Sequence, residues 1–153
     1  MDDQTIITTS PSDTEKFAAQ FAARLRPGDL VLLSGDLGSG KTTFARAAAR
    51  ALGVVGPVTS PTFAIGNVHG GADGVEVAHL DLYRLDRLAI GDEATLDDFL
   101  TDQRIAFVEW PHDELIEFPR LRAIVEIDHA GGDSRELKVQ WRDRDSSTGE
   151  VAA

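Results

Sequence analysis

The chain is predicted to fold as an α/β sandwich, because segments with helical and strand patterns alternate along its 153 residues. Residues 30–33 form an apolar run that fits a strand buried on both faces, and apolar residues at helical spacing follow from Phe44 to Leu52. Residues 123–127 and 136–141 flank a Gly-Gly-Asp turn, which predicts an antiparallel hairpin. We therefore expect a mixed sheet, parallel around the first strand and antiparallel toward the end of the chain.

A helix is expected to precede this strand. Ser12 and Glu15 fit a capping box, in which each side chain bonds a free backbone N–H of the first turn. Helical spacing places three apolar side chains on one face, namely Phe17, Phe21 and Leu25. The Pro-Gly-Asp sequence at residues 27–29 is expected to end the helix.

The middle of the chain is expected to hold an extended segment, a glycine-rich hairpin or loop tip, a strand, a short helix and a buried strand, at residues 58–65, 66–74, 75–81, 94–100 and 105–108. The extended segment is predicted because a proline disfavours helical angles at the residue before it. Asp92 is a candidate cap for the short helix.

Residues 1–141 are predicted to form a single domain, and the polar residues 142–153 lack apolar periodicity and are expected to be a disordered tail. No long apolar run or basic leader is visible, so we expect a cytoplasmic protein without a membrane span. The absence of cysteine excludes disulfides and thiolate metal sites.

The formal net charge is -11, and only Lys16, Lys41 and Lys138 are lysines. Affinity for nucleic acids comes largely from Lys and Arg at the phosphates, so the chain is poorly suited to holding RNA or DNA by itself. Two readings of the arginines stay open. They could form a local patch, or they could lie scattered on a solvated face, at Arg84, Arg87, Arg104, Arg120 and Arg122.

A glycine-rich loop joins the first buried strand to the helix after it, which is the context of a phosphate-binding loop (P-loop). Its glycines allow backbone N–H groups to turn inward around an anion, and the helix N-terminus adds its positive dipole end. Lys41 is expected to reach the β- and γ-phosphates, and the Thr42 hydroxyl is expected to bind Mg²⁺. The candidate nucleotide-binding residues are Gly35, Asp36, Leu37, Gly38, Ser39, Gly40, Lys41, Thr42 and Thr43.

Two carboxylates follow strand candidates and are expected at the same sheet edge as the loop, because ligands collect at the carboxyl ends of parallel strands. Glu109 follows the more apolar strand, whereas Asp81 lies in a segment rich in polar side chains. Either could bind Mg²⁺ beside Thr42, and with Lys41 they are the candidate catalytic residues. The alternative for each is a carboxylate that caps the next turn or faces water.

Thr59, Ser60 and Thr62 place three hydroxyls beside Pro61, a pattern compatible with a segment that a γ-phosphate orders. An edge strand with exposed hydroxyls would look the same. Trp110, next to Glu109, is open to a functional role or to packing alone.

Four motifs occur in order, and together they closely resemble the TsaE (YjeE) family of small bacterial ATPases required for threonylcarbamoyladenosine modification of tRNA. They are Gly35 to Thr43, Ser60-Pro61-Thr62-Phe63, His79 to Leu85, and Val108-Glu109-Trp110-Pro111. The resemblance spans about residues 8–141 and implies a three-layer, P-loop NTPase-like sandwich.

The resemblance also implies roles. Lys41 would bind phosphate, Thr42 and Glu109 would bind Mg²⁺, and Asp81 would be an essential acid near the metal. Residues 60–63 would be a switch segment and Trp110 a required tryptophan, while Ser12 to Thr14 and the hairpin near Arg135 would lie by the base and ribose. The protein would then be an ATPase with slow turnover alone, which docks on a TsaB–TsaD heterodimer and resets it, with tRNA held by the partners.

Two other functions share the same loop. A small-molecule or nucleoside kinase would need an acceptor pocket and an arginine-bearing lid, and no long insertion of that kind follows Asp81. A nucleotide-binding regulator without hydrolysis would bind ATP and show no turnover even with partners.

Overall fold

The computed structural model describes residues 3–36, 38–56, 66–83, 96–111 and 113–144. The strands are β1 (Gln4–Thr8), β2 (Leu30–Gly35), β3 (Gly66–Gly70), β4 (Glu76–Asp81), β5 (Arg104–Glu109), β6 (Leu121–His129) and β7 (Arg135–Trp141). The helices are α1 (Pro11–Ala22) and α2 (Lys41–Ala51), with two 3-10 turns, η1 (Ala72–Gly74) and η2 (Asp113–Glu117). Residues 96–99 are also helical.

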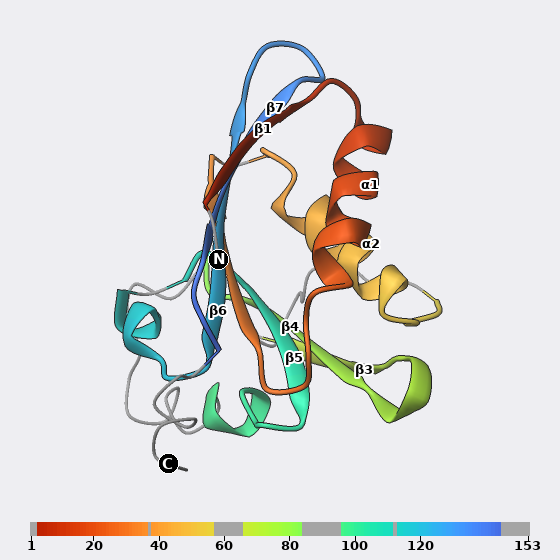
Figure 1. Cartoon of the computed structure of the whole chain (residues 1–153), viewed down its shortest axis with the longest axis vertical. Helices are drawn as coiled ribbons and strands as arrows, with labels where there is room; N and C mark the ends of the chain where they lie inside the picture. Colours follow the sequence, from red (N-terminus) through yellow and green to blue (C-terminus); the bar gives the residue numbers. More distant parts are fainter. Residues whose placement is uncertain (1–2, 37, 57–65, 84–95, 112, 145–153) are drawn as a thin grey trace.

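All described strands join one mixed sheet in the order β1-β7-β6-β2-β5-β4-β3 (Figure 1). β2 lies between β5 and β6 and is parallel to both, and β4 is parallel to β5. The remaining pairs are antiparallel, including the β6–β7 hairpin. The expected mixed sheet is therefore confirmed, and the carboxyl ends of β4, β5 and β2 meet at one edge.

The strand β2 is buried on both faces, as its apolar run predicts. Val31 and Leu33 belong to a core with α1 and α2, which cover one face of the sheet (Figure 1). Leu30 and Leu32 belong to a second core on the other face, whose cover within the described ranges is short segments including Leu96, Leu100 and Leu115. Within the described residues, α1 and α2 therefore cover one face of the sheet, and short segments cover the other.

The start of α1 differs from the prediction. Ser10, not Ser12, is the N-cap, and its side-chain oxygen accepts a hydrogen bond from Asp13 N–H at 3.1 Å. Pro11 follows as the first helical residue, where a missing N–H costs nothing because that group has no partner inside the helix. The predicted capping box of Ser12 and Glu15 is therefore wrong, because the cap lies two residues earlier, at Ser10.

The glycine-rich stretch 66–74 also differs, because its first half is strand β3, paired antiparallel with β4. A Cβ on Gly66 would lie 2.9 Å from Leu80 Cγ, so a glycine permits this close pairing. The reversal falls at residues 71–75, where Gly71 N–H donates to Val75 C=O at 2.7 Å. The expected strand at 75–81 is confirmed as β4.

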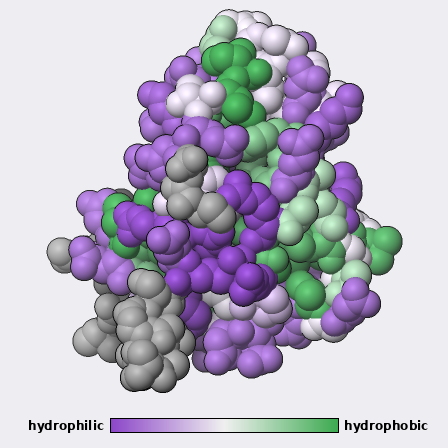
Figure 2. All heavy atoms as spheres, in the orientation of Figure 1, coloured by the Kyte–Doolittle hydropathy of each residue, from purple (hydrophilic) through white to green (hydrophobic). Residues whose placement is uncertain are grey.

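Several predicted segments lie outside the described residues. They are the extended segment at 58–65 with its neighbouring switch residues, Asp92 and the start of the helix after it, Arg84, Arg87, and most of the tail. Within the described residues no helix is long and apolar enough to cross a membrane. Hydrophilic side chains cover much of the face seen in Figure 2, with hydrophobic patches between them.

Candidate functional site

The loop after β2 is shaped by its glycines. Gly35 has a φ of 128°, and a Cβ there would lie 1.9 Å from Ile127 C=O on β6, so only glycine fits. Gly40 has a φ of 110° and caps α2 without any side-chain hydrogen bond. No side chain at the cap position therefore stands between the start of α2 and a ligand, and a helix N-terminus of this kind has the geometry that binds anions. Leu37 lies outside the described residues.

Lys41, the first residue of α2, is buried within this loop and is 4% exposed. Its Nζ donates to Gly35 C=O at 3.1 Å and to Asp36 C=O at 2.7 Å. Burial lowers the pKa of the ammonium, while the nearby carboxylate of Glu109 acts in the opposite direction. A cation held by neutral carbonyls and shielded from water interacts strongly with an anion that enters the loop.

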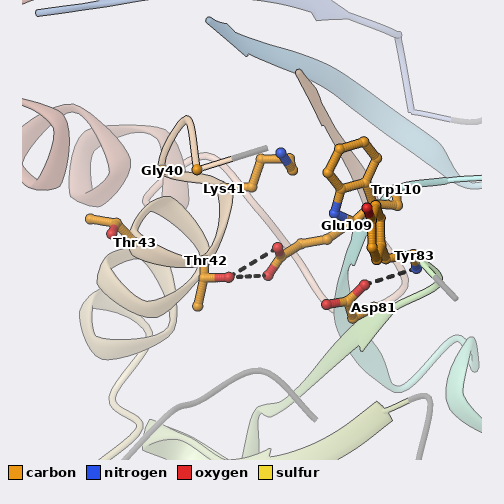
Figure 3. Close-up of a pocket in the computed structure, with 9 residues that line it drawn as sticks. Gly40, Lys41, Thr42, Thr43, Asp81, Tyr83, Glu109 and Trp110 are labelled. Carbon is orange, nitrogen blue, oxygen red and sulfur yellow. Dashed lines mark hydrogen bonds between the residues drawn. The ribbon is translucent and has the colours of Figure 1, made fainter. Parts of the chain in front are cut away.

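Thr42 and Glu109 meet across the cavity, although 67 positions separate them (Figure 3). The Thr42 hydroxyl lies 3.0 Å from Oε1 and 2.8 Å from Oε2 of Glu109. Glu109 ends β5 and is 3% exposed, and its Oε2 also lies 2.6 Å from His79 Nε2. The carboxylate is thus buried and held from two sides.

Asp81 ends β4 and pairs in register with Glu109. Its Oδ1 accepts a hydrogen bond from Tyr83 N–H at 2.9 Å, so it caps the turn after its strand. It also lines the cavity that contains Lys41 and Thr42. The two functions weighed for this carboxylate, turn cap and site residue, are therefore compatible.

Trp110 packs against the site and is also part of its wall. It has a φ of 55°, which a non-glycine residue rarely adopts, and its N–H donates to Leu33 C=O at 3.1 Å. Its ring centroid lies 4.1 Å from Lys41 Nζ and 4.8 Å from the ring of Tyr83 (Figure 3). The backbone strain places an aromatic face over the buried cation.

A cavity of about 380 Å³ connects these groups. Its wall consists of Gly38, Gly40, Lys41, Thr42, Thr43, Asp81, Tyr83, Glu109 and Trp110. The loop, both candidate carboxylates and Trp110 are thus brought together as the sequence predicts. Gly35 and Asp36 lie behind this wall and hold Lys41. Thr59, Ser60, Pro61 and Thr62 lie outside the described residues.

Arg135 lies beside the cavity rather than in it. Its Nε donates to Ser39 C=O at 2.8 Å, which ties the start of β7 to the glycine-rich loop. With Thr14 and Thr43 it lines a neighbouring cavity of about 60 Å³. The first turn of α1 and the β6–β7 hairpin therefore meet next to the loop.

Two residues at the site, His79 and Tyr83, belong to the sequence motif from His79 to Leu85, but the sequence assigns neither of them a role. Both are close to Asp81 in the sequence: His79 lies two residues before it, on the same face of the strand, and Tyr83 lies in the turn that follows it. Their partners, Glu109 and Trp110, follow from the pairing of β4 with β5, which a single sequence does not specify.

The side chains at the cavity that could act as metal ligands are oxygen donors. Within the described residues no cluster of three or more His, Cys, Asp or Glu side chains could hold a metal. Thr42 and Glu109 offer hydroxyl and carboxylate oxygens, the ligands Mg²⁺ takes together with phosphates and water. The buried Lys41 lines the same cavity.

Comparisons with known proteins agree on one family. The family model "Threonylcarbamoyl adenosine biosynthesis protein TsaE" matches residues 8–137. A Bacillus subtilis protein named tRNA threonylcarbamoyladenosine biosynthesis protein TsaE is 38% identical over 131 residues, 85% of this chain and 80% of that protein. A Streptomyces coelicolor protein of the same name is 44% identical over 119 residues, 76% of this chain and 80% of that one.

A solved structure supports the same assignment. The crystal structure of Bacillus subtilis YdiB superposes with a TM-score of 0.68 at 32% identity, and the match covers 98% of this chain and 93% of that one. The family model spans most of the chain, including the glycine-rich loop, Asp81 and Glu109. The chain therefore belongs to the TsaE family.

Proposed function

We propose that this protein is a Mg²⁺-dependent ATPase that serves tRNA threonylcarbamoyladenosine biosynthesis as an accessory protein. The contact between the Thr42 hydroxyl and the Glu109 carboxylate, beside the buried Lys41, carries the proposal. One cavity would thus contain Lys41 as the phosphate-binding group and Thr42 and Glu109 as the magnesium ligands. When bound there, Mg²⁺ would neutralise phosphate charge and orient the triphosphate.

Nucleotide binding is assigned to the loop and the start of α2. Backbone N–H groups between Gly38 and Thr43 would surround the phosphates, and Lys41 would exchange its carbonyl contacts for phosphate oxygens. Arg135, the first turn of α1 and the small cavity between them are assigned to the base and ribose. This arrangement supports a P-loop NTPase-like fold.

Hydrolysis is assigned to positioning and electrostatics, because phosphoryl transfer to water needs no covalent nucleophile. Glu109 is buried and fixed by two hydrogen bonds, so it holds a constant position next to Thr42. Asp81 is oriented by Tyr83 N–H at the same cavity wall, where it is suited to orient an attacking water.

The partner is proposed to be a TsaB–TsaD-like heterodimer, with tRNA bound by the partners, in a cytoplasmic complex. The net charge of -11 supports an indirect role toward tRNA. ATP binding would allow docking, and hydrolysis would reset the complex. Trp110 and the segment from Thr59 to Thr62 are assigned to this coupling.

Steady-state ATP hydrolysis, measured alone and with the purified heterodimer, tests the proposal. We expect slow turnover alone, stimulation by the heterodimer, and no stimulation of a Lys41→Ala variant. Vigorous turnover without partners would contradict an accessory role, and absence of hydrolysis with partners would leave a nucleotide-binding regulator. Phosphate transfer to a nucleoside panel, followed by product mass, would instead identify a kinase.

A further inference from the structure

His79 is a buried polar side chain next to the cavity but is absent from its wall. It lies on β4 two residues before Asp81 and is 1% exposed. Val77, two residues earlier, belongs to the core with α1 and α2. Because alternate side chains of a strand share a face, His79 lies on the α2 side of the sheet, as Asp81 does.

The imidazole bonds the carboxylate that faces Thr42. His79 Nε2 lies 2.6 Å from Glu109 Oε2, and the same oxygen accepts the Thr42 hydroxyl at 2.8 Å. A carboxylate that binds Mg²⁺ only accepts hydrogen bonds, so in the proposed function Nε2 is the donor of this contact. The other ring nitrogen, Nδ1, is buried without a hydrogen-bond partner in the part of the chain that the structure describes. The polar contact of this ring is thus directed at Glu109.

From this geometry we infer that His79 is a positioning residue, which fixes the rotamer of Glu109 so that its carboxylate stays directed at Thr42, beside which it would hold a magnesium ion. The inference rests on the proposed function. A glutamate has three rotatable bonds, and one short hydrogen bond to a rigid ring restricts the last of them. Bonds of this kind behind a metal ligand typically change metal affinity or activity by about 10- to 100-fold.

The competing explanation is that His79 fills space in the core. A packing role depends on volume, and an aliphatic side chain of similar size would fulfil it. A positioning role depends on one N–H donor at the place of Nε2. The side-chain amide of glutamine can put an N–H there, whereas leucine cannot. The pair His79→Leu and His79→Gln therefore separates the two roles.

The primary experiment measures the magnesium dependence of binding of a non-hydrolysable ATP analogue, by calorimetry or with a fluorescent label. For His79→Leu we expect unchanged affinity in the presence of EDTA, within about twofold, because Lys41 and the loop are intact. The Mg²⁺ concentration for half-maximal tightening should rise by about 10- to 100-fold. His79→Gln should recover most of this loss, and thermal unfolding of each variant reports on packing.

Two controls locate the effect. His69 lies on the neighbouring strand β3 and is absent from the hydrogen bonds of Glu109, so His69→Gln should leave the magnesium dependence unchanged. In a Glu109→Gln background, His79→Leu should add little, because a residue that acts through Glu109 has no effect once its target is altered. Independent, additive losses would contradict the inference.

The outcomes separate this inference from the proposed function. If the wild-type protein shows no magnesium-dependent nucleotide binding, the proposed function fails. If the wild type binds as proposed and His79→Leu has the same magnesium dependence, His79 is a packing residue and the inference fails. The inference also fails if His79→Gln is folded and as impaired as His79→Leu.

Discussion

The two ends of the parallel strands both bury charged side chains, but they use them differently. At the carboxyl ends, Lys41 and Glu109 line a cavity of about 380 Å³, and Glu109 bonds the side chains of Thr42 and His79. At the amino ends, Arg122 is 2% exposed, stacks on Trp141 and donates to Arg142 C=O.

Other polar groups at the amino ends follow the same pattern. Arg120 donates to Gly28 C=O and Leu100 C=O, and the Asp29 carboxylate accepts Arg26 N–H at 2.8 Å. Their partners are largely backbone groups of neighbouring segments, so these side chains fasten loops to the sheet. Charges at the carboxyl ends are instead available to a ligand. Burial of charge alone therefore does not identify a site, whereas buried charges that line one cavity do.

Glu109→Gln is the change expected to have the largest effect on function. We expect ATP hydrolysis to fall by about 100- to 1000-fold, because a fixed charged group next to the phosphates is lost. Nucleotide affinity in EDTA should stay within a few-fold of the wild type, whereas Lys41→Ala should weaken it strongly. Equal losses of affinity in both variants would remove the distinction between binding and hydrolysis.

Gly35→Ala tests how the loop depends on the sheet. The added Cβ would meet Ile127 C=O at 1.9 Å, and the φ of 128° disfavours any side chain. We expect a loss of about 3 kcal/mol in the free energy of unfolding, together with weaker nucleotide binding. Gly70→Ala, at an exposed position of strand β3, is the control, because its Cβ would meet nothing within 4 Å and Gly70 is not among the glycines with positive φ. Similar denaturant midpoints for the two variants would show that the contact with Ile127 and the positive φ do not cause the loss of stability.

Arg122→Leu tests the amino ends. Removal of this guanidinium takes a donor from Arg142 C=O and a stacking partner from Trp141, so we expect a loss of about 2 kcal/mol in the free energy of unfolding. Turnover per folded molecule should change less than about twofold, since the site is at the other end. Lys138→Leu, at an exposed position of β7, is the matched surface control. A loss of turnover without a loss of stability would contradict a structural role for Arg122.

His69→Gln is the change expected to have the smallest effect, and it should alter only the pH dependence of stability. Burial, followed by the proximity of His79, lowers the pKa of the His69 imidazole, so below the unfolded pKa near 6.5 the unfolded chain binds more protons. This stability contribution is present above that pH and is lost as the pH falls through the folded pKa. His69→Gln should therefore flatten the decline of the unfolding temperature between about pH 7 and pH 5. Identical slopes would contradict this contribution.

The sequence predicts the strand, loop and helix from residue 30 to residue 51 well, because their signals are local. It also predicts that Asp81 and Glu109 converge, since both end parallel strands. Strand β1 was missed, because the edge segment Gln4–Thr8 is a strand only through its pairing with β7. The bond between His79 and Glu109 depends on strand register, and the place of Trp110 over Lys41 depends on an unusual φ. Neither is encoded in a local pattern.

A crystal structure with a non-hydrolysable ATP analogue and Mg²⁺ tests the proposed site most directly. The triphosphate should lie in the cavity between the loop and Trp110, with Lys41 Nζ on its β- and γ-phosphates. The ion should contact the Thr42 hydroxyl, with Glu109 or Asp81 adjacent. A triphosphate bound elsewhere, or an ion that contacts neither Thr42 nor these carboxylates, would contradict the proposed function.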